Sequence, residues 1–317
     1  MTKESWQPSA SLAHLRQRAL IFDQIRQFFK QRDYLEVETP VMAHHAVTDV
    51  YLSNIEASFQ GRTYYLQTSP EYHMKRLLVA GSGPIFQLAR AFRDDELGRW
   101  HNPEFTLLEW YQLDIDHHEL MQEVDELLQA VLGCPPLIKK TYQSVFMAAC
   151  DLDPFTADIA TLKQALHRFN LSDTLPEEEN DPDQYLFLLM SHVVEPALAQ
   201  LDGPVAVYDF PTRQAALAQI RQDRAERFEI YYKGIELANG FHELRQASIQ
   251  QARFEQDNAQ RRQLGLPEKP IDAFFLEALK QGLPECSGVA LGLDRLLALA
   301  LNCSDISSVM AFTIANA

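Results

Sequence analysis

Two strand-like segments separated by a short polar loop constrain the fold of this chain more than any other feature. The segments are PIFQLARAFRDDE and EFTLLEWYQLD, and the loop between them is LGRWHNP. Because successive side chains of a strand point to opposite faces, Arg93, Glu109 and Tyr111 are expected on one side of this hairpin, together with Gln87, Phe105 and Leu107. The other side is apolar enough to pack on a helix, with Phe86, Leu88, Phe92, Leu108 and Trp110.

The loop and its flanks hold more polar functionality than a turn needs. The polar residues are Arg93, Asp94, Asp95, Glu96, Arg99, His101, Asn102 and Glu104. A solvated loop with surface ion pairs is the alternative interpretation. Against it, Arg93 and Glu109 are expected on a sheet face, where an unpaired charge costs several kcal/mol unless a ligand or partner satisfies it. The hairpin is therefore a candidate ligand site.

A second acidic segment is RFEIYYKGIELANGFHEL. If residues 231–234 make a turn, Glu229 lies opposite Glu236. Two opposed carboxylates repel each other, and a divalent cation would relieve the repulsion. Glu243 adds a third acid nearby. The alternative is that these residues are exposed acids at a strand edge.

The segment GVALGLDRLLALAL joins a strand to an apolar helix. Gly288, Ala290 and Gly292 alternate along the strand, and small residues there let a flat ligand lie against the backbone. Asp294 and Arg295 open the helix, where an arginine can meet an anion. Glycine-rich strand packing explains the small residues equally well.

The rest of the chain is predicted mainly from its periodicity. Residues 11–33 form a helix with a buried stripe of Leu15, Ala19, Phe22, Ile25 and Phe29. YLEVETPVM follows as a strand whose path is set by Pro40. The next helix, EYHMKRLLVAG, starts with Ser69 as N-cap and Pro70 as its first residue, and it stops at a glycine. Residues 114–227 are expected to form helices around the sheet, including a solvated acidic loop, and a charged helix is expected over residues 247–264.

Composition and charge exclude several classes of protein. The 317 residues contain 28 Lys and Arg and 44 Asp and Glu, which gives a net charge of −16. This balance argues against a broad nucleic-acid surface, because such a surface needs clustered basic side chains. The four cysteines form no CxxC pair, and neither a leader segment nor an apolar run of membrane-spanning length occurs. A cytoplasmic protein is expected.

Metal-binding motifs are also missing from the sequence. The chain has no HExxH, and the pairs His44-His45 and His117-His118 lack ligand spacing to any cysteine or third histidine. We therefore expect no metal at these histidines.

Taken in order, the motifs resemble those of class II aminoacyl-tRNA synthetases, with the catalytic core of lysyl-tRNA synthetase as the nearest match. YLEVETPVM resembles motif 1, FRDDELGRWHNPEFTLLEWY resembles motif 2, and GVALGLDR resembles motif 3. TSPEYHMKRLL and GIELANGFHEL resemble the lysine-type segments between them. The resemblance implies an α+β fold, a mainly antiparallel sheet flanked by helices, and a homodimer formed through the motif 1 helix and strand.

The domain organisation that follows is one synthetase-like catalytic domain over residues 1–317 with a helical insertion at about 114–227. The motif 1 helix begins near Ser11, so no N-terminal anticodon-binding OB domain is expected. In this the chain resembles truncated paralogues of lysyl-tRNA synthetase, a family that activates (R)-β-lysine with ATP and transfers it to a lysine side chain of elongation factor P. Elongation factor P is then the expected partner, and neither tRNA nor a membrane is expected.

The resemblance also implies residue roles. Arg93 and Arg295 are the expected catalytic residues, because positive charge is needed where the substrate carboxylate attacks phosphorus. The ATP site is expected at Arg93, Asp94, Asp95, Asn102, Phe105, Glu236, Leu237, Gly292 and Arg295. The substrate site is expected at Ser69, Glu71, Glu109, Tyr111, Asn239, Glu243 and Ala290. Mg²⁺ is expected at Glu229 and Glu236.

Three positions depart from the synthetase pattern. Ala290 replaces the middle glycine of GxGxGxDR, and its methyl group would crowd an α-amino group next to the substrate carboxylate. A substrate with its amine one carbon further along could fit better. Ala238 and His242 replace Gly and Ser in GNGFSE. The alternatives to a β-lysine ligase are a minimal lysyl-tRNA synthetase and a non-catalytic regulatory paralogue, although the second predicts loss of the motif arginines, which are present.

Overall fold

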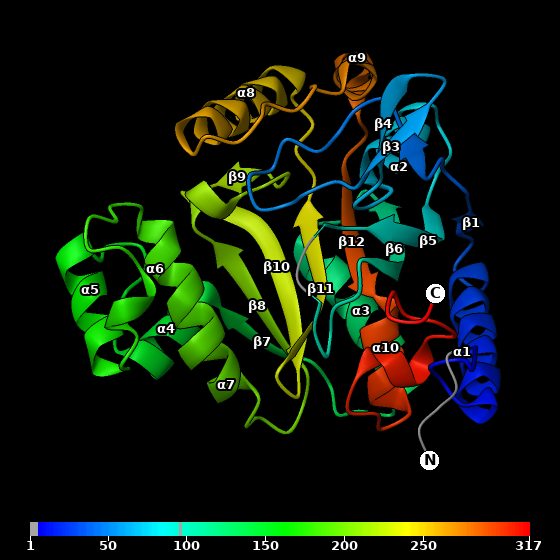
Figure 1. The fold of residues 1–317 in the computed structure, drawn as a ribbon, viewed down its shortest axis with the longest axis horizontal. Helices are drawn as coiled ribbons and strands as arrows, with labels where there is room; N and C mark the ends of the chain where they lie inside the picture. The colour runs from blue at the N-terminus through cyan, green and yellow to red at the C-terminus, as the bar shows by residue number, and fades with distance from the viewer. Residues whose placement is uncertain (1–5, 95–96) are drawn as a thin grey trace. The chain divides into compact units, whose positions relative to one another are not determined.

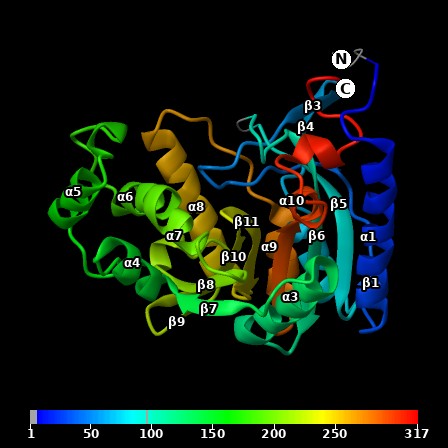
Figure 2. The same cartoon turned by 90° about the horizontal axis from the view of Figure 1, so that it is seen from below.

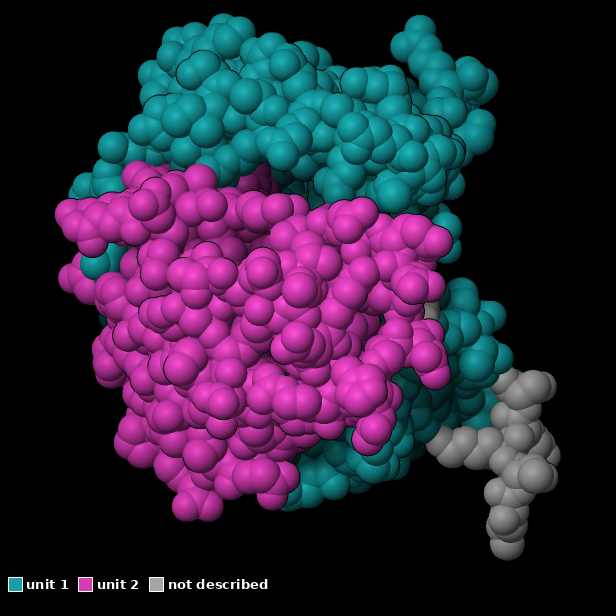
Figure 3. Space-filling view, turned by 90° about the vertical axis from the view of Figure 1, so that its left-hand side faces the viewer, with its two compact units in different colours: residues 1–116, 130–132, 244–317 teal, residues 117–129, 133–243 magenta. Residues whose placement is uncertain are grey.

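The computed structural model describes residues 6–94 and 97–317. The chain forms two compact units, shown in different colours in Figure 3. The first comprises residues 1–116, 130–132 and 244–317, and the second comprises residues 117–129 and 133–243. Helices flank strands that pair mostly antiparallel in both units, so the predicted α+β fold is confirmed.

The sheet of the first unit contains the predicted hairpin at its centre (Figure 1). Its strands follow the order β1 (Leu35–Glu36), β5 (Ile85–Phe92), β6 (Glu104–Leu113) and β12 (Cys286–Gly292). Strands β5 and β6 are antiparallel with Gln87 opposite Glu109, and β12 continues this row with Ala290 opposite Glu109. The alternation predicted for the two segments is confirmed by this register.

Helix α1 (Leu12–Lys30) covers the apolar face of this hairpin and runs alongside β5 in Figure 2. The Phe29 ring stacks on Phe86 at a centroid distance of 4.6 Å and meets Trp110 edge-on at 5.3 Å. The predicted stripe is only partly right, because Ala19 is exposed and the buried face consists of Ile21, Ile25, Phe28 and Phe29. The N-terminal half of α1 therefore keeps apolar side chains at the surface.

The strand predicted over YLEVETPVM is broken in two, which corrects the sequence prediction. Strand β1 pairs parallel with β5, whereas β2 (Met42–Ala43) joins a second sheet of order β2-β4-β3 with β3 (Glu56–Phe59) and β4 (Arg62–Leu66). Pro40 lies between β1 and β2 and has no N–H for a ladder. The chain changes sheets at this point.

Four longer helices complete the first unit. They are α2 (Glu71–Val79), α8 (Ala247–Gln263), α9 (Ala273–Gly282) and α10 (Leu293–Ala300), with a short 3₁₀ turn at Ile306–Val309. Helix α2 starts one position later than predicted, with Pro70 as N-cap, and Ser69 Oγ accepts a 3.1 Å hydrogen bond from the Glu71 N–H. It stops as predicted at Gly81, whose φ of +86° suits the end of a helix.

The second unit is built on strands in the order β11 (Ile235–His242), β10 (Arg224–Tyr232), β8 (Val205–Phe210) and β7 (Ile138–Thr141), with β9 (Ile220–Arg221) on β10. Helix α3 (His117–Leu132) belongs to it as far as Gln129. A helical layer packs on β8 and comprises α4 (Tyr142–Cys150), α5 (Ile159–Arg168), α6 (Pro182–Leu189) and α7 (Glu195–Leu198). Strands β7 and β8 fall within the stretch for which only helices were predicted.

The β10–β11 hairpin turns at Lys233–Gly234, where both residues have positive φ, as a two-residue type I′ turn requires. The predicted pairing of Glu229 with Glu236 is therefore wrong. Glu229 lies opposite Asn239, and Glu236 lies opposite Tyr231. The two registers are joined by a β-bulge that leaves one extra residue on β11, Leu237.

Candidate active site

Arg93 and Phe105 form an aromatic–cationic pair beside the motif 2 loop. The Arg93 guanidinium carbon lies 5.1 Å from the centroid of the Phe105 ring, within cation–π range. The Arg93 N–H donates to the Pro103 carbonyl at 2.9 Å, which anchors the backbone just beyond β5. An aromatic face next to a guanidinium can hold a nucleotide base and a phosphate in one site.

Arg295 extends from the first turn of α10, whose N-cap is Gly292, and its side chain reaches the same loop. Its Nε donates to the Trp100 carbonyl at 3.2 Å, and its Nη2 lies 2.8 Å from His101 Nε2. The neighbouring Asp294 is buried and anchors the helix start. Both predicted catalytic arginines therefore flank the motif 2 loop, within the first unit.

The anchor of α10 is an ion pair that the sequence analysis did not predict. Arg18 of α1 donates to Asp294 Oδ1 at 2.6 Å, and the Thr106 N–H of β6 donates to Oδ2 at 2.7 Å. The Asp294 carboxylate thus joins α1, β6 and α10, three segments far apart in the chain. No local spacing signals such a contact.

The remaining loop residues are placed less directly for a nucleotide. Asn102 is buried, and its amide donates to the Glu104 carbonyl at 2.6 Å and accepts from the Ile314 N–H at 3.1 Å. Asp94 is exposed, and its N–H donates to the Ser53 carbonyl. The predicted ligand Asp95 lies outside the described residues.

Glu109 is the most perturbed group of the first unit's polar face. Its side chain is only 2% exposed, and burial, reinforced by the charge of Glu71, raises its pKa from 4.5 to about 8. Tyr111 donates a 2.7 Å hydrogen bond to Oε1, whereas the buried Oε2 has no hydrogen-bond partner in the described part of the chain. A carboxylate with an unsatisfied buried oxygen fits the ammonium group of a ligand.

A second carboxylate, Glu71, is already paired. Lys75 lies one helical turn further along α2, and its Nζ donates to Glu71 Oε1 at 2.5 Å. The sequence analysis missed Lys75, although a Glu followed by a Lys four residues later is a recognised helical pair. When Glu109 is ionised, as a bound ammonium group would favour, Glu71, Glu109 and Lys75 together carry one net negative charge for a cationic ligand.

The second unit holds the predicted metal carboxylates. The bulge at Leu237 puts Glu236 on the same face of the hairpin as Glu229, at a diagonal rather than opposite position. Arg227 donates to Glu229 Oε1 at 2.5 Å, and the Tyr231 hydroxyl donates to Oε2. Burial raises the pKa of Glu229. The positive charge of Arg227 lowers this pKa, and the negative charge of Glu236 raises it further.

Arg227 also connects Glu229 to a predicted substrate residue. Its Nε donates to Asn239 Oδ1 at 3.2 Å, across the strand pair. Arg227 is another residue that the sequence analysis missed, although its position two residues before Glu229 places it on the same face. Glu243, which follows β11, is buried and forms an isolated bridge with Ala218.

The comparisons with known proteins agree with this architecture. A family model described as tRNA synthetases class II (D, K and N) matches residues 6–316. The chain belongs to this class II synthetase family. Two curated relatives, from Salmonella arizonae and Salmonella gallinarum, are each 52% identical over 319 residues, which covers 98% of this chain and 98% of the relative. Both are named elongation factor P–(R)-β-lysine ligase.

The donor sets found here fit the groups that class II synthetases use. Arg93, Arg295 and the Phe105 ring suit the phosphates and base of ATP, and membership of the family implies that ATP is used. Glu229 and Glu236 offer carboxylate oxygens, the ligands that Mg²⁺ prefers. Across residues 6–94 and 97–317, no helix is both long and apolar enough to cross a membrane.

Proposed function

We propose that this chain activates (R)-β-lysine with ATP and transfers the β-lysyl group to a lysine side chain of elongation factor P. The observation that carries the proposal is the buried Glu109 carboxylate, which lies opposite Ala290 on the polar face of the sheet and has one oxygen without a hydrogen bond from residues 6–94 and 97–317. It is supported by the names of the two relatives, which are similar to this chain over nearly its whole length.

In the first step the substrate carboxylate attacks the α-phosphorus of ATP in line, and pyrophosphate leaves. Arg93 would neutralise the charge that builds on the α-phosphate, Phe105 would stack on adenine, and Arg295 would reach the γ-phosphate. Asp94, Asp95, Asn102, Gly292 and the backbone of Glu236 and Leu237 would line the nucleotide. Glu229 and Glu236 would hold Mg²⁺, which would screen the negative charge of the phosphates.

In the second step the ε-amine of the acceptor lysine attacks the acyl-adenylate, an amide bond forms, and AMP leaves. No protein nucleophile is needed, so positioning and charge neutralisation supply the catalysis. Glu109, Tyr111 and Glu243 would bind the distal ammonium, and Asn239 would orient the carboxylate. Glu71, with Ser69 beside it, would bind the nearer amine and share its charge with Lys75.

Ala290 is the residue that would distinguish β-lysine from α-lysine. It lies on β12 directly opposite Glu109. Its methyl group would occupy the space next to the substrate carboxylate where an α-ammonium group would sit. An amine moved by one carbon avoids this contact.

The experiment incubates the full chain with ATP, Mg²⁺, (R)-β-lysine and elongation factor P, and measures the mass of the acceptor. A gain of one β-lysyl group is expected, together with pyrophosphate exchange that (R)-β-lysine stimulates more than lysine does. Charging of tRNA with lysine would instead indicate a minimal lysyl-tRNA synthetase. Absence of exchange with either amino acid would indicate a non-catalytic paralogue.

We also propose that the protein is a cytoplasmic homodimer. The acceptor in the name of the relatives is a translation factor, which works in the cytoplasm, and the motif 1 helix mediates dimerisation in class II synthetases. We propose no tRNA or membrane as a partner.

A further inference from the structure

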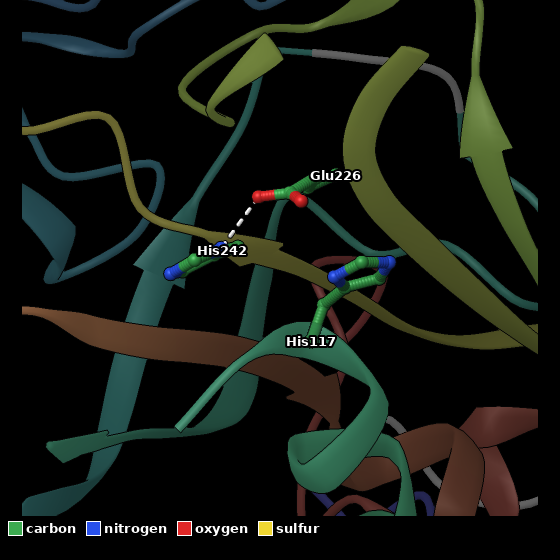
Figure 4. A group of neighbouring side chains, drawn as sticks. All are labelled: His117, Glu226 and His242. Atoms are coloured by element: carbon green, nitrogen blue, oxygen red, sulfur yellow. Dashed lines mark hydrogen bonds and ion pairs between the residues drawn. The ribbon is translucent and has the colours of Figure 1, made fainter. Parts of the chain in front are cut away.

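A buried cluster of two histidines and one glutamate lies in the second unit, outside the groups assigned above (Figure 4). His117 is the first residue of α3, Glu226 belongs to β10, and His242 is the last residue of β11. All three side chains are buried, and each offers one ligand atom within 4.8 Å of the other two. Figure 4 shows the three side chains meeting from three separate elements.

The cluster is distinct from the proposed Mg²⁺ carboxylates of the same hairpin. His242 lies three residues after Asn239 on β11, and the pairing of β11 with β10 has no irregularity between Ala238 and Phe241. An odd separation along a regular strand puts two side chains on opposite faces, so His242 faces away from Asn239. Glu226 lies at an irregularity of β10 and is placed with His242 by the direct contact between the two side chains.

Glu226 and His242 are close partners across the strand pair. Oε2 of the glutamate lies 2.5 Å from Nδ1 of the histidine. A simple ion pair would explain these two residues, but it leaves the third member of the cluster unexplained.

His117 is that third member, and it is 3% exposed. Neither Nδ1 nor Nε2 has a hydrogen-bond partner among the residues that the structure describes. Its nearest charged neighbour is Asp209 of β8, whose Oδ1 lies 3.6 Å from Nε2, beyond hydrogen-bond range. A buried imidazole that makes no hydrogen bond is costly, and few are found without a reason.

We propose that His117, Glu226 and His242 bind a divalent transition-metal ion, for which Zn²⁺ is the best fit. Two imidazole nitrogens and one carboxylate oxygen form a donor set that Zn²⁺ accepts, with water as the fourth ligand, whereas Mg²⁺ prefers oxygen alone. Zn–N distances of about 2.0–2.1 Å imply about 3.3 Å between the ligand atoms of a tetrahedral site. The three ligand atoms now lie within 4.8 Å of one another, so ion binding would adjust the side chains to that spacing.

Asp209 would orient the imidazole ring of His117, one of the three proposed metal-binding side chains. A metal-binding histidine usually donates its second ring N–H to a carboxylate or carbonyl. With Asp209 next to Nε2, His117 presents Nδ1 to the ion. The charges of Glu226 and Asp209 then balance those of the divalent cation, so the buried site is neutral.

The proposed ion ties the first turn of α3 to the β10–β11 hairpin inside the second unit. The sequence analysis found no third ligand at a suitable spacing for the pair His117-His118. His242 and Glu226 stand more than a hundred residues away in the chain, and only the fold brings them to His117.

The test measures metal content on the full-length protein. The chain is stripped with a chelator, dialysed against Zn²⁺ in the presence of excess Mg²⁺, and analysed by mass spectrometry of the elements. About one Zn²⁺ per chain is expected for the wild type, and less than about one tenth for His117→Ala and His242→Ala. The matched control is His118→Ala, which removes the adjacent histidine and should keep the full content.

A gentler variant tests the orienting carboxylate. Asp209 has a φ of +61°, which asparagine tolerates, so Asp209→Asn preserves the backbone. Its Kd for Zn²⁺ should rise about 10- to 100-fold, the usual effect of losing such a partner. An unchanged Kd would remove Asp209 from the proposal.

Substitution with Co²⁺ keeps the proposal testable if the histidine variants do not fold. Wild-type protein with one Co²⁺ should show the intense visible bands of a four-coordinate ion and no thiolate charge-transfer band. Uptake of neither Zn²⁺ nor Co²⁺, weak six-coordinate bands, or full metal content in folded His117→Ala protein would each overturn the proposal. These readouts do not depend on ligase activity, so they are independent of the proposed function.

Discussion

Burial favours the protonated, neutral form of Glu109, whereas the proposed function requires the ionised carboxylate. Its pKa in the folded protein is about 8, against 4.5 for an ordinary glutamate. The folded state therefore binds a proton at Glu109 more tightly than the unfolded state does. This difference contributes to the free energy of unfolding in full below pH 4.5, and the contribution is lost as the pH rises towards 8. A bound substrate ammonium would lower the pKa of Glu109 again, because it stabilises the charged carboxylate.

Glu109→Gln should accordingly raise the melting temperature at pH 8 and leave it nearly unchanged at pH 4.5. The amide carries no charge to bury, so the wild-type penalty, on the order of a few kcal/mol at pH 8, disappears. The same variant should lose (R)-β-lysine-dependent pyrophosphate exchange. Thermal denaturation at both pH values is the measurement, with Glu104→Gln on the same strand as the exposed control. A lower melting temperature at pH 8 would contradict the prediction.

Ala290→Gly should shift substrate preference towards α-lysine. Removal of the methyl group opens the space opposite Glu109 where the α-ammonium group would sit. The ratio of kcat/KM for (R)-β-lysine to that for lysine should fall about tenfold, which corresponds to about 1.4 kcal/mol. Pyrophosphate exchange with both amino acids measures the ratio. If the ratio stays constant, Ala290 does not discriminate between them.

Glu243→Gln should weaken binding of lysine-type substrates and leave ATP binding nearly intact. The change keeps the shape of this buried side chain but removes the charge that would face the distal ammonium. KM for (R)-β-lysine should rise about 10- to 100-fold, in line with the loss of one charge-assisted hydrogen bond. Steady-state kinetics with each substrate varied in turn is the measurement, and the exposed Glu268→Gln serves as control. An equal rise in KM for ATP and for (R)-β-lysine would contradict the proposed role of Glu243 in binding the distal ammonium.

At the scale of elements, α1 and β1 keep three leucine side chains at the surface. Leu20 on α1 is 60% exposed, and Leu12 and Leu35 are more than half exposed as well. The buried face of α1 packs on the hairpin, so these leucines lie on surface that a second copy of the chain can cover.

Leu20→Glu should therefore shift the protein from dimer to monomer, because it would place a charge in an apolar interface. Sedimentation velocity across a range of protein concentrations measures the change. Leu264→Glu is the matched control, since Leu264 is 58% exposed beyond the end of α8, and it should remain dimeric. A monomeric wild type would refute the proposed dimer.

At the scale of the whole molecule, the net charge of −16 should affect the rate at which the proposed acceptor, elongation factor P, binds. An acidic protein attracts a basic surface from a distance. Salt weakens this attraction beyond the Debye length, which is about 8 Å at physiological ionic strength. Raising the salt concentration should increase KM for elongation factor P several-fold and change KM for (R)-β-lysine much less. Initial rates at low and high KCl, at constant Mg²⁺, test this. Equal salt effects on the two substrates would show that the charge does not steer the acceptor.

Much of the first unit could be predicted from local patterns. The alternation along β5 and β6 predicted which side chains share a face, and the observed register pairs Gln87 with Glu109 as that pattern requires. The burial of Phe29 also followed from simple periodicity, whereas its contact with Phe86 comes from the structure. Such patterns work because a strand or helix repeats its geometry along the chain.

The predicted strand pairings were wrong where a single residue changes the register or the path of a strand. The bulge at Leu237 and the turn at Lys233–Gly234 move Glu236 from opposite Glu229 to a diagonal place on the same face. Pro40 splits a predicted strand between two sheets. A single inserted residue changes the register of every later pair, and local propensity does not reveal where it occurs.

By itself the sequence determined the family motifs, the α+β class and the polar hairpin face, because each of these depends on neighbours along the chain. The residues proposed to handle ATP and β-lysine follow from the resemblance of those motifs to the family. Only the tertiary structure decided that Asp294 joins α1 to α10 through Arg18 and that His117 meets Glu226 and His242. Both contacts join residues far apart in the chain, so they exist only after the elements have packed. Burial is likewise a property of the folded molecule, and together with the charge of Glu71 it raises the pKa of Glu109, which couples the charge of Glu109 to substrate binding.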